Sequence, residues 1–168
     1  MQDNYFVRNC ACMLVVIFLI TSCTTVSPPS APAGSFQAQK GNLPWPAQGD
    51  IIEPYGTVVN PTYGTEAINP GILISTVSTT VVSAVHGGKV ESIYVMPEYG
   101  NLITISHGEY TTVYGNLSEM YVNEGVTVEA GQYIASAGSQ LEPKGEAIFF
   151  AIFQQGQEMD PALWLRKQ

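Results

Sequence analysis

Few side chains in this sequence could support metal or nucleophile chemistry. Its only histidines are His86 and His107. A catalytic zinc site needs three imidazole, thiolate or carboxylate ligands and a water molecule. Both histidines would therefore have to converge with an acidic residue such as Glu146 or Asp160. No Gly-x-Ser-x-Gly motif offers a serine nucleophile. His86 precedes a Gly-Gly pair, where we expect an exposed turn, so these residues alone predict no catalytic site.

The three cysteines indicate export rather than catalysis. Two of them lie in CACMLVVIFLI, an unbroken apolar run, and residues 20–23 (ITSC) resemble a bacterial lipobox. The run is shorter than the roughly 20 residues of a membrane-spanning helix. We therefore expect a lipoprotein signal peptide over residues 1–22 and a lipidated Cys23; an ordinary secretory signal is the alternative. Thr24, in place of an aspartate, favours attachment to the outer membrane, facing the periplasm of the bacterial envelope.

Composition separates a linker from one folded domain. Residues 23–42 are rich in Pro, Ser, Ala and Gly and lack apolar periodicity, which predicts a disordered tether. Residues 43–168 have the length of a single domain. The formal charge of the chain is −8, with only six Lys and Arg. No basic surface is therefore available for a phosphate backbone, and nucleic acid is excluded as a partner.

Short alternating segments predict β structure throughout the domain. In NLITISH, Ile103, Ile105 and His107 share one face, a period of two that is typical of a half-buried strand. Other strand-like segments are 71–74, 80–85, 89–96, 111–117 and 147–153. The last of these, AIFFAIF, is entirely apolar, which is typical of a strand covered on both faces. Residues 57–69 are expected to be loop. These patterns predict an all-β fold of short antiparallel strands.

Several separated motifs resemble one known family. YGNLITISHG, TVYGNLS and VNEGVTVEAGQYIASAG are similar to the core of the LytM-type (lysostaphin-like) zinc metallopeptidase domain. LPWPAQGDIIEPYG resembles its first strand, and EAIFFAIFQQGQEMDPALWL resembles its closing strand and terminal turn. The resemblance implies a small antiparallel β-sheet sandwich of the LytM/duplicated-hybrid type over residues 43–168. It also implies that His107 is a structural residue of a His-Gly turn.

The same resemblance implies that the family's chemistry has been lost. The zinc-binding pattern His-x-Gly-x-Asp is matched by NPGIL, with Asn69 and Leu73 in the ligand positions. The His-x-His pattern of the last strand is matched by Ala147 and Phe149, and the Tyr-x-His-Leu pattern has Asn116 in place of its histidine. Leucine and phenylalanine offer no lone pair, and asparagine is a poor zinc ligand. We therefore expect a pseudo-peptidase without a metal, a cofactor or catalytic residues.

What the resemblance leaves is a groove. Its expected partner-binding residues are Asn69, Leu73, Asn116, Ala147, Phe149 and Ala151. A mostly apolar floor with a few amides suits the apolar face of a peptide or helix; the alternative is that Phe149 merely fills the emptied cavity. The function expected is activation of a separate, amidase-like peptidoglycan hydrolase. The alternative is a structural protein that binds peptidoglycan or an envelope assembly without affecting hydrolase activity.

Overall fold

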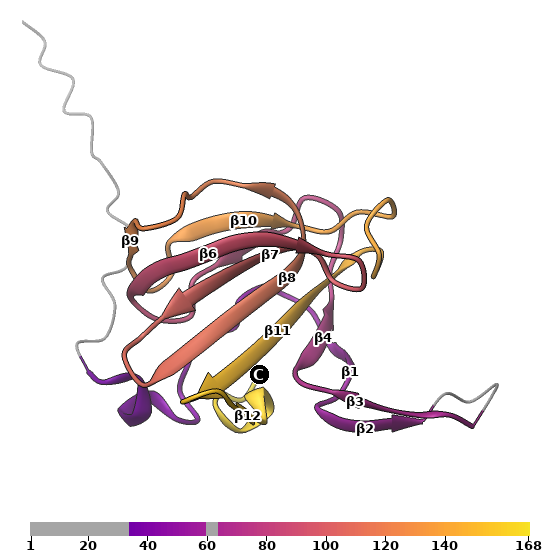
Figure 1. Cartoon of the computed structure of the whole chain (residues 1–168), viewed down its shortest axis with the longest axis horizontal. Coiled ribbons are helices and arrows are strands. Elements are labelled where there is room, and N and C mark those ends of the chain that lie inside the picture. The colour runs from indigo at the N-terminus through magenta and orange to yellow at the C-terminus, as the bar shows by residue number, and fades with distance from the viewer. Residues whose placement is uncertain (1–33, 60–63) are drawn as a thin grey trace, which may run out of the picture.

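The computed structural model describes residues 34–59 and 64–168. The expected signal peptide, the lipidation site Cys23 and the first part of the expected tether lie outside these described residues. The described part is built from strands and two short 3-10 turns (Figure 1). Its strands are β1 (Ile51–Glu53), β2 (Gly56–Val59), β3 (Glu66–Asn69), β4 (Ile72–Ser75), β5 (Val81–Ser83), β6 (Gly88–Met96), β7 (Gly100–Ser106), β8 (Tyr110–Met120), β9 (Thr127–Val128), β10 (Tyr133–Ala137), β11 (Ala147–Gln154) and β12 (Gln157–Met159).

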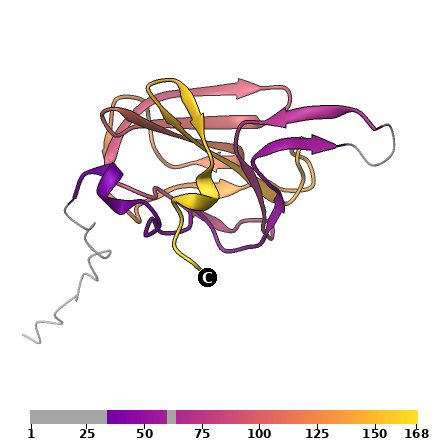
Figure 2. The same ribbon diagram turned by 90° about the horizontal axis from the view of Figure 1, so that it is seen from below.

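Ten of these strands form one antiparallel sheet, in the order β1-β4-β11-β8-β7-β6-β9, with β10, β5 and β12 attached to its side. β8 connects the two parts, since its first half pairs with β7 and β11 while its end pairs with β10. Figures 1 and 2 show β10, in orange, in a different layer from β6 and β7. The large apolar core lies between the layers. The expected all-β antiparallel fold is confirmed.

β11 lies inside the sheet, between β4 and β8, and is covered on both faces. Ile148, Phe150 and Ile152 enter the large core. Ala147, Phe149 and Ala151 form a second cluster with Leu73, Leu102 and Val113, which we call the floor cluster. The alternation predicted from AIFFAIF is therefore confirmed. β7 was expected to be half-buried, and this was wrong because Leu102 on its second face packs in the floor cluster.

A two-stranded arm replaces the loop expected at residues 57–69. β2 and β3 pair antiparallel, with Val58 opposite Ala67 and Thr57 opposite Ile68, and the arm projects from the body of the domain (Figure 1). The polar residues of this segment favoured a loop. Pairing satisfies the backbone groups on the facing edges of the two strands regardless of side-chain polarity, and it therefore overrides that composition.

The folded unit begins before the boundary expected at residue 43. Residues Phe36–Gln39 form a 3-10 turn (η1), and Phe36 is only 2% exposed. Its ring lies 4.8 Å from that of His107, 5.0 Å from that of Tyr110 and 5.2 Å from that of Trp164, measured between centroids. The expected tether therefore extends too far, because one buried aromatic ring anchors a segment that has no apolar periodicity.

His86 and His107 both contact this anchor. The expectation of an exposed turn at His86 was wrong: the side chain is half-buried, with Nε2 3.1 Å from the carbonyl oxygen of Gly34 and the ring edge-on to Phe36. Nδ1 of His107 lies 2.8 Å from the carbonyl oxygen of Gly87, so it carries the proton of the neutral ring. Both histidines hold local structure together.

Burial gives the stability of the domain a pH dependence. Desolvation lowers the pKa of His107 from 6.5 to about 4, against a raising effect of the Gly87 hydrogen bond and with a further lowering by His86. The unfolded chain therefore binds a proton between about pH 6.5 and pH 4 that the folded chain does not. We therefore expect the free energy of unfolding to fall by roughly 2–3 kcal/mol as the pH is lowered from about 6.5 to about 4. Urea titrations at several pH values measure this free energy of unfolding. In a His107→Gln variant it should depend much less on pH over the same range.

Candidate functional site

The fold brings together residues that the family resemblance assigned to the groove, from β3, β4, β8 and β11. Leu73 on β4 lies directly opposite Phe149 on β11, and Phe149 lies opposite Gly115 on β8, next to Asn116. Asn69 ends β3, two residues before the tightly packed Gly71. A Cβ atom added at Gly71 would approach Cζ of Phe149 to 2.8 Å, so only glycine fits there. Leu73, Phe149 and the Gly115–Asn116 segment are therefore neighbours across three adjacent strands.

The same residues are not accessible, however. None of the six expected groove residues is more than 8% exposed. The ring of Phe149 is covered by that of Tyr99, with centroids 4.3 Å apart. Of the six, only Asn69 lines a cleft that a partner could enter, and the burial of the other five contradicts their expected role as a binding surface. Phe149 packs as a core residue of the floor cluster, against Tyr99.

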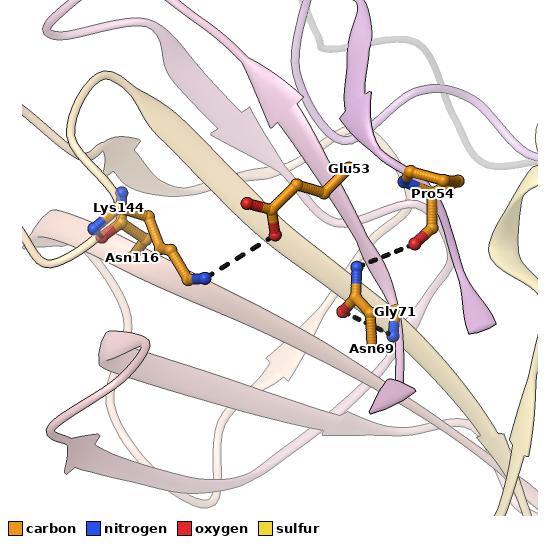
Figure 3. Close-up of polar contacts among 6 residues, drawn as sticks. All are labelled: Glu53, Pro54, Asn69, Gly71, Asn116 and Lys144. Atoms are coloured by element: carbon orange, nitrogen blue, oxygen red, sulfur yellow. Dashed lines mark hydrogen bonds and ion pairs between the residues drawn. The ribbon is translucent and has the colours of Figure 1, made fainter. Parts of the chain in front are cut away.

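The side-chain amides of both asparagines are hydrogen-bonded to backbone groups. Nδ2 of Asn69 donates to the carbonyl oxygen of Pro54 at 2.9 Å, and its Oδ1 accepts from the amide of Gly71 at 3.4 Å (Figure 3). Oδ1 of Asn116 accepts from the amide of Lys144 at 2.9 Å. Both side chains therefore have structural partners.

Zinc does not fit the residues present. Leu73, Ala147 and Phe149 have no lone pair to offer a metal, and the amide groups of both asparagines are already hydrogen-bonded. Within residues 34–59 and 64–168, no group of three His, Cys, Asp or Glu side chains is placed to hold a metal ion. His86 and His107 do lie together, but Asp160 caps the turn η2 (Pro161–Leu163) by accepting from the amide of Ala162 at 2.9 Å.

An open cleft of about 380 Å³ lies beside this buried floor, between the arm and the main sheet. It is lined by Glu53, Val58, Val59, Thr65, Ala67, Ile68, Asn69, Tyr99 and Lys144. Val58 and Ala67 share one face of the arm because they are directly opposite in its register. Of these lining residues, sequence reasoning found only Asn69. Tyr99 precedes the YGN motif, but nothing in the sequence indicated that the arm would stand opposite it.

Charged groups surround Tyr99 at one side of the cleft. Nζ of Lys144 lies 3.6 Å from Oε2 of Glu53 (Figure 3). The same Nζ lies 5.5 Å from the centre of the Tyr99 ring. Burial raises the pKa of the Tyr99 hydroxyl above its usual 10.0, and the carboxylates of Glu98, Glu53 and Glu158 raise it further. The cleft thus combines apolar side chains with acidic groups and one lysine.

Comparisons with known proteins agree with this geometry. The model of Peptidase family M23 matches residues 67–161. Lipoprotein YgeR of Escherichia coli is 38% identical over 128 residues, which is 74% of this chain and 47% of YgeR. Murein hydrolase activator EnvC of Escherichia coli is 30% identical over 133 residues, which is 79% of this chain and 31% of EnvC. This chain therefore spans less than half the length of these curated relatives.

A solved structure shares the fold. The structure of Helicobacter pylori Csd3 superposes with a TM-score of 0.65 at 20% identity, over 75% of this chain and 35% of that one. In the part of this chain that the structure describes, no helix is long and apolar enough to cross a membrane. The family match covers more than half of the sequence and includes the floor cluster and much of the cleft. The chain belongs to peptidase family M23.

Proposed function

We propose that this chain is a non-catalytic member of family M23 that activates a separate peptidoglycan hydrolase. The observation that carries the proposal is the filled metal position: Leu73 and Phe149 pack in the floor cluster beneath Tyr99. Such a centre supplies no Lewis acid and no activated water, so the domain can act only by binding. The name of EnvC, a murein hydrolase activator, supports the same class of function.

The cleft, rather than the buried floor, is the proposed binding surface. Val58, Ala67 and Tyr99 offer apolar area, and burial of such area against a partner contributes roughly 25 cal/mol per Å². Glu53 and Lys144 add charges of both signs that fix the orientation of a protein segment. A hydrolase blocked by one of its own segments would open if the cleft bound that segment more tightly. The shift is limited by the difference in affinity between the two states.

Attachment to the envelope is proposed through Cys23. The lipobox-like residues 20–23 and the name of lipoprotein YgeR support it. Two or more acyl chains give stable membrane attachment, whereas one gives marginal binding. Placement on the outer membrane rests on Thr24 alone.

The experiment adds the purified chain to peptidoglycan digests by purified hydrolases of the organism that encodes it. Alone, the chain should release nothing from purified cell walls and should contain no stoichiometric zinc by metal analysis. With its partner hydrolase, it should raise the rate of release severalfold. A tightly held zinc together with wall cleavage would refute the pseudo-peptidase. Sedimentation with walls but no stimulation of any hydrolase would favour the structural alternative.

A further inference from the structure

We infer that Asn116 is a positioning residue for the cleft, holding the loop that carries Lys144. The inference rests on the proposed function, because it assigns the loop to the proposed binding surface. The amide of Asn116 makes three hydrogen bonds: Oδ1 accepts from the amide of Lys144 at 2.9 Å, and Nδ2 donates to the carbonyl oxygens of Gly145 at 2.9 Å and Ala147 at 2.7 Å. The side chain is fully buried.

The backbone of Asn116 is hydrogen-bonded to Tyr99, the residue over which Lys144 lies. Its amide donates to the carbonyl oxygen of Tyr99 at 2.5 Å. Its φ is +58°, a left-handed conformation in which asparagine is one of the few tolerated side chains. One residue therefore fixes Tyr99 through its backbone and the Lys144 loop through its side chain.

Close packing supports this arrangement. A Cβ atom added at Gly138 would overlap Nδ2 of Asn116, and one added at Gly100 would approach Cδ of Pro143 to 3.3 Å. Two glycines thus let the loop close onto Asn116. Leu141, at the outer part of the loop, is 93% exposed and contributes little packing of its own.

The ion pair at the end of the loop is too weak to replace Asn116. The side chains of Lys144 and Glu53 are 29% and 41% exposed, and exposed pairs of this kind contribute little to stability. Hydrogen bonds of a buried amide are stronger, and each backbone group left without its partner is penalised. The position of Lys144 over Tyr99 is therefore decided by Asn116.

A histidine, the residue type of the family pattern at this position, could not hold the loop in this way. A neutral imidazole has one donor and one acceptor, whereas Asn116 uses two donors and one acceptor. The replacement of histidine by asparagine therefore does more than remove a catalytic group. It supplies the hydrogen bonds that shape one wall of the cleft.

Asn116→Gly is the direct test, because glycine accepts the positive φ and removes the side-chain amide together with its methylene group. We expect hydrogen exchange at the Lys144 amide to accelerate at least about tenfold, since its acceptor is gone, while amides in the middle of β8 and β11 keep their protection. Stimulation of the partner hydrolase should fall by a similar factor. Asn116→Asp keeps the shape and the acceptor but not the donors, so it should fall between Asn116→Gly and the parent protein in both measurements.

The matched control is Asn101→Ala, which removes an amide that donates to the carbonyl oxygen of Leu117 at 2.7 Å on the neighbouring strand. It should change neither exchange at Lys144 nor stimulation. Unchanged exchange at Lys144 in Asn116→Gly would overturn the inference, as would full stimulation despite faster exchange. If Asn116→Gly does not fold, the same two criteria are applied to Asn116→Asp. If the parent protein stimulates no hydrolase, the proposed function fails, and the exchange measurement still decides the positioning role.

Discussion

An Ala67→Arg variant should lose at least about tenfold of its hydrolase stimulation while it remains folded. Ala67 is exposed on β3 and lines the cleft opposite Tyr99 and Lys144. A long cationic side chain there would fill the space that the partner segment needs and would place a positive charge near that of Lys144. Exposed substitutions of this kind usually change stability by less than about 0.5 kcal/mol. The measurement is the rate of wall digestion by the hydrolase at saturating concentrations of parent and variant.

Thr57→Arg is the matched control for this prediction. Thr57 is also exposed on the arm, and it does not line the cleft, although Ile68 directly opposite it does. Thr57→Arg adds the same charge and bulk at a position that does not line the cleft, and it should keep full stimulation. Full stimulation by both variants would show that the cleft does not bind the hydrolase. Equal loss in both would indicate a general effect of charge on the arm.

A Phe36→Ala variant should lower the free energy of unfolding by about 3–5 kcal/mol, the usual range for deleting a buried phenylalanine. The ring contacts the aromatic side chains of His107, Tyr110 and Trp164, and it is 2% exposed. Its loss would leave a cavity and would let water reach His107, whose lowered pKa should rise toward 6.5. Urea unfolding and an NMR titration of His107 measure the two effects.

Leu163→Ala provides the comparison, since Leu163 is apolar, lies in the nearby turn η2 and is 61% exposed. Leu163→Ala should lower the free energy of unfolding much less than Phe36→Ala does. A loss below about 1 kcal/mol for Phe36→Ala would contradict the view that residues 35–42 belong to the folded unit. The prediction also implies that a chain shortened to residues 43–168 would be markedly less stable than the chain described here.

Much of the fold could be predicted because strand alternation is a local property. AIFFAIF places Phe149 and Phe150 on opposite faces whatever lies around them, and the structure assigns them to the two clusters accordingly. The His-Gly turn that the family resemblance implied at His107 lies between β7 and β8. The family motifs, in their correct order, then identified which residues would meet.

Alternation does not say what covers a face. Phe149 could have lined an open groove or a closed core with the same sequence pattern, and the choice is made by Tyr99, which is 50 positions away in the chain. The arm is a similar case, since the pairing of Val58 with Ala67 depends on bringing two short segments together rather than on the preference of either. The choice of the cleft, rather than the floor cluster, as the candidate binding site therefore depends on the tertiary structure.

The sequence by itself determined the β-strand pattern and the small number of Lys and Arg, because each depends only on residue type and spacing. Together with the family resemblance, it also indicated that Asn69, Leu73 and Phe149 stand where the family has zinc ligands. The tertiary structure decided the burial of Phe36, the closure of the floor cluster and the three hydrogen bonds of Asn116. These depend on contacts between residues far apart in the chain, whose free energy is gained only once the whole sheet has formed.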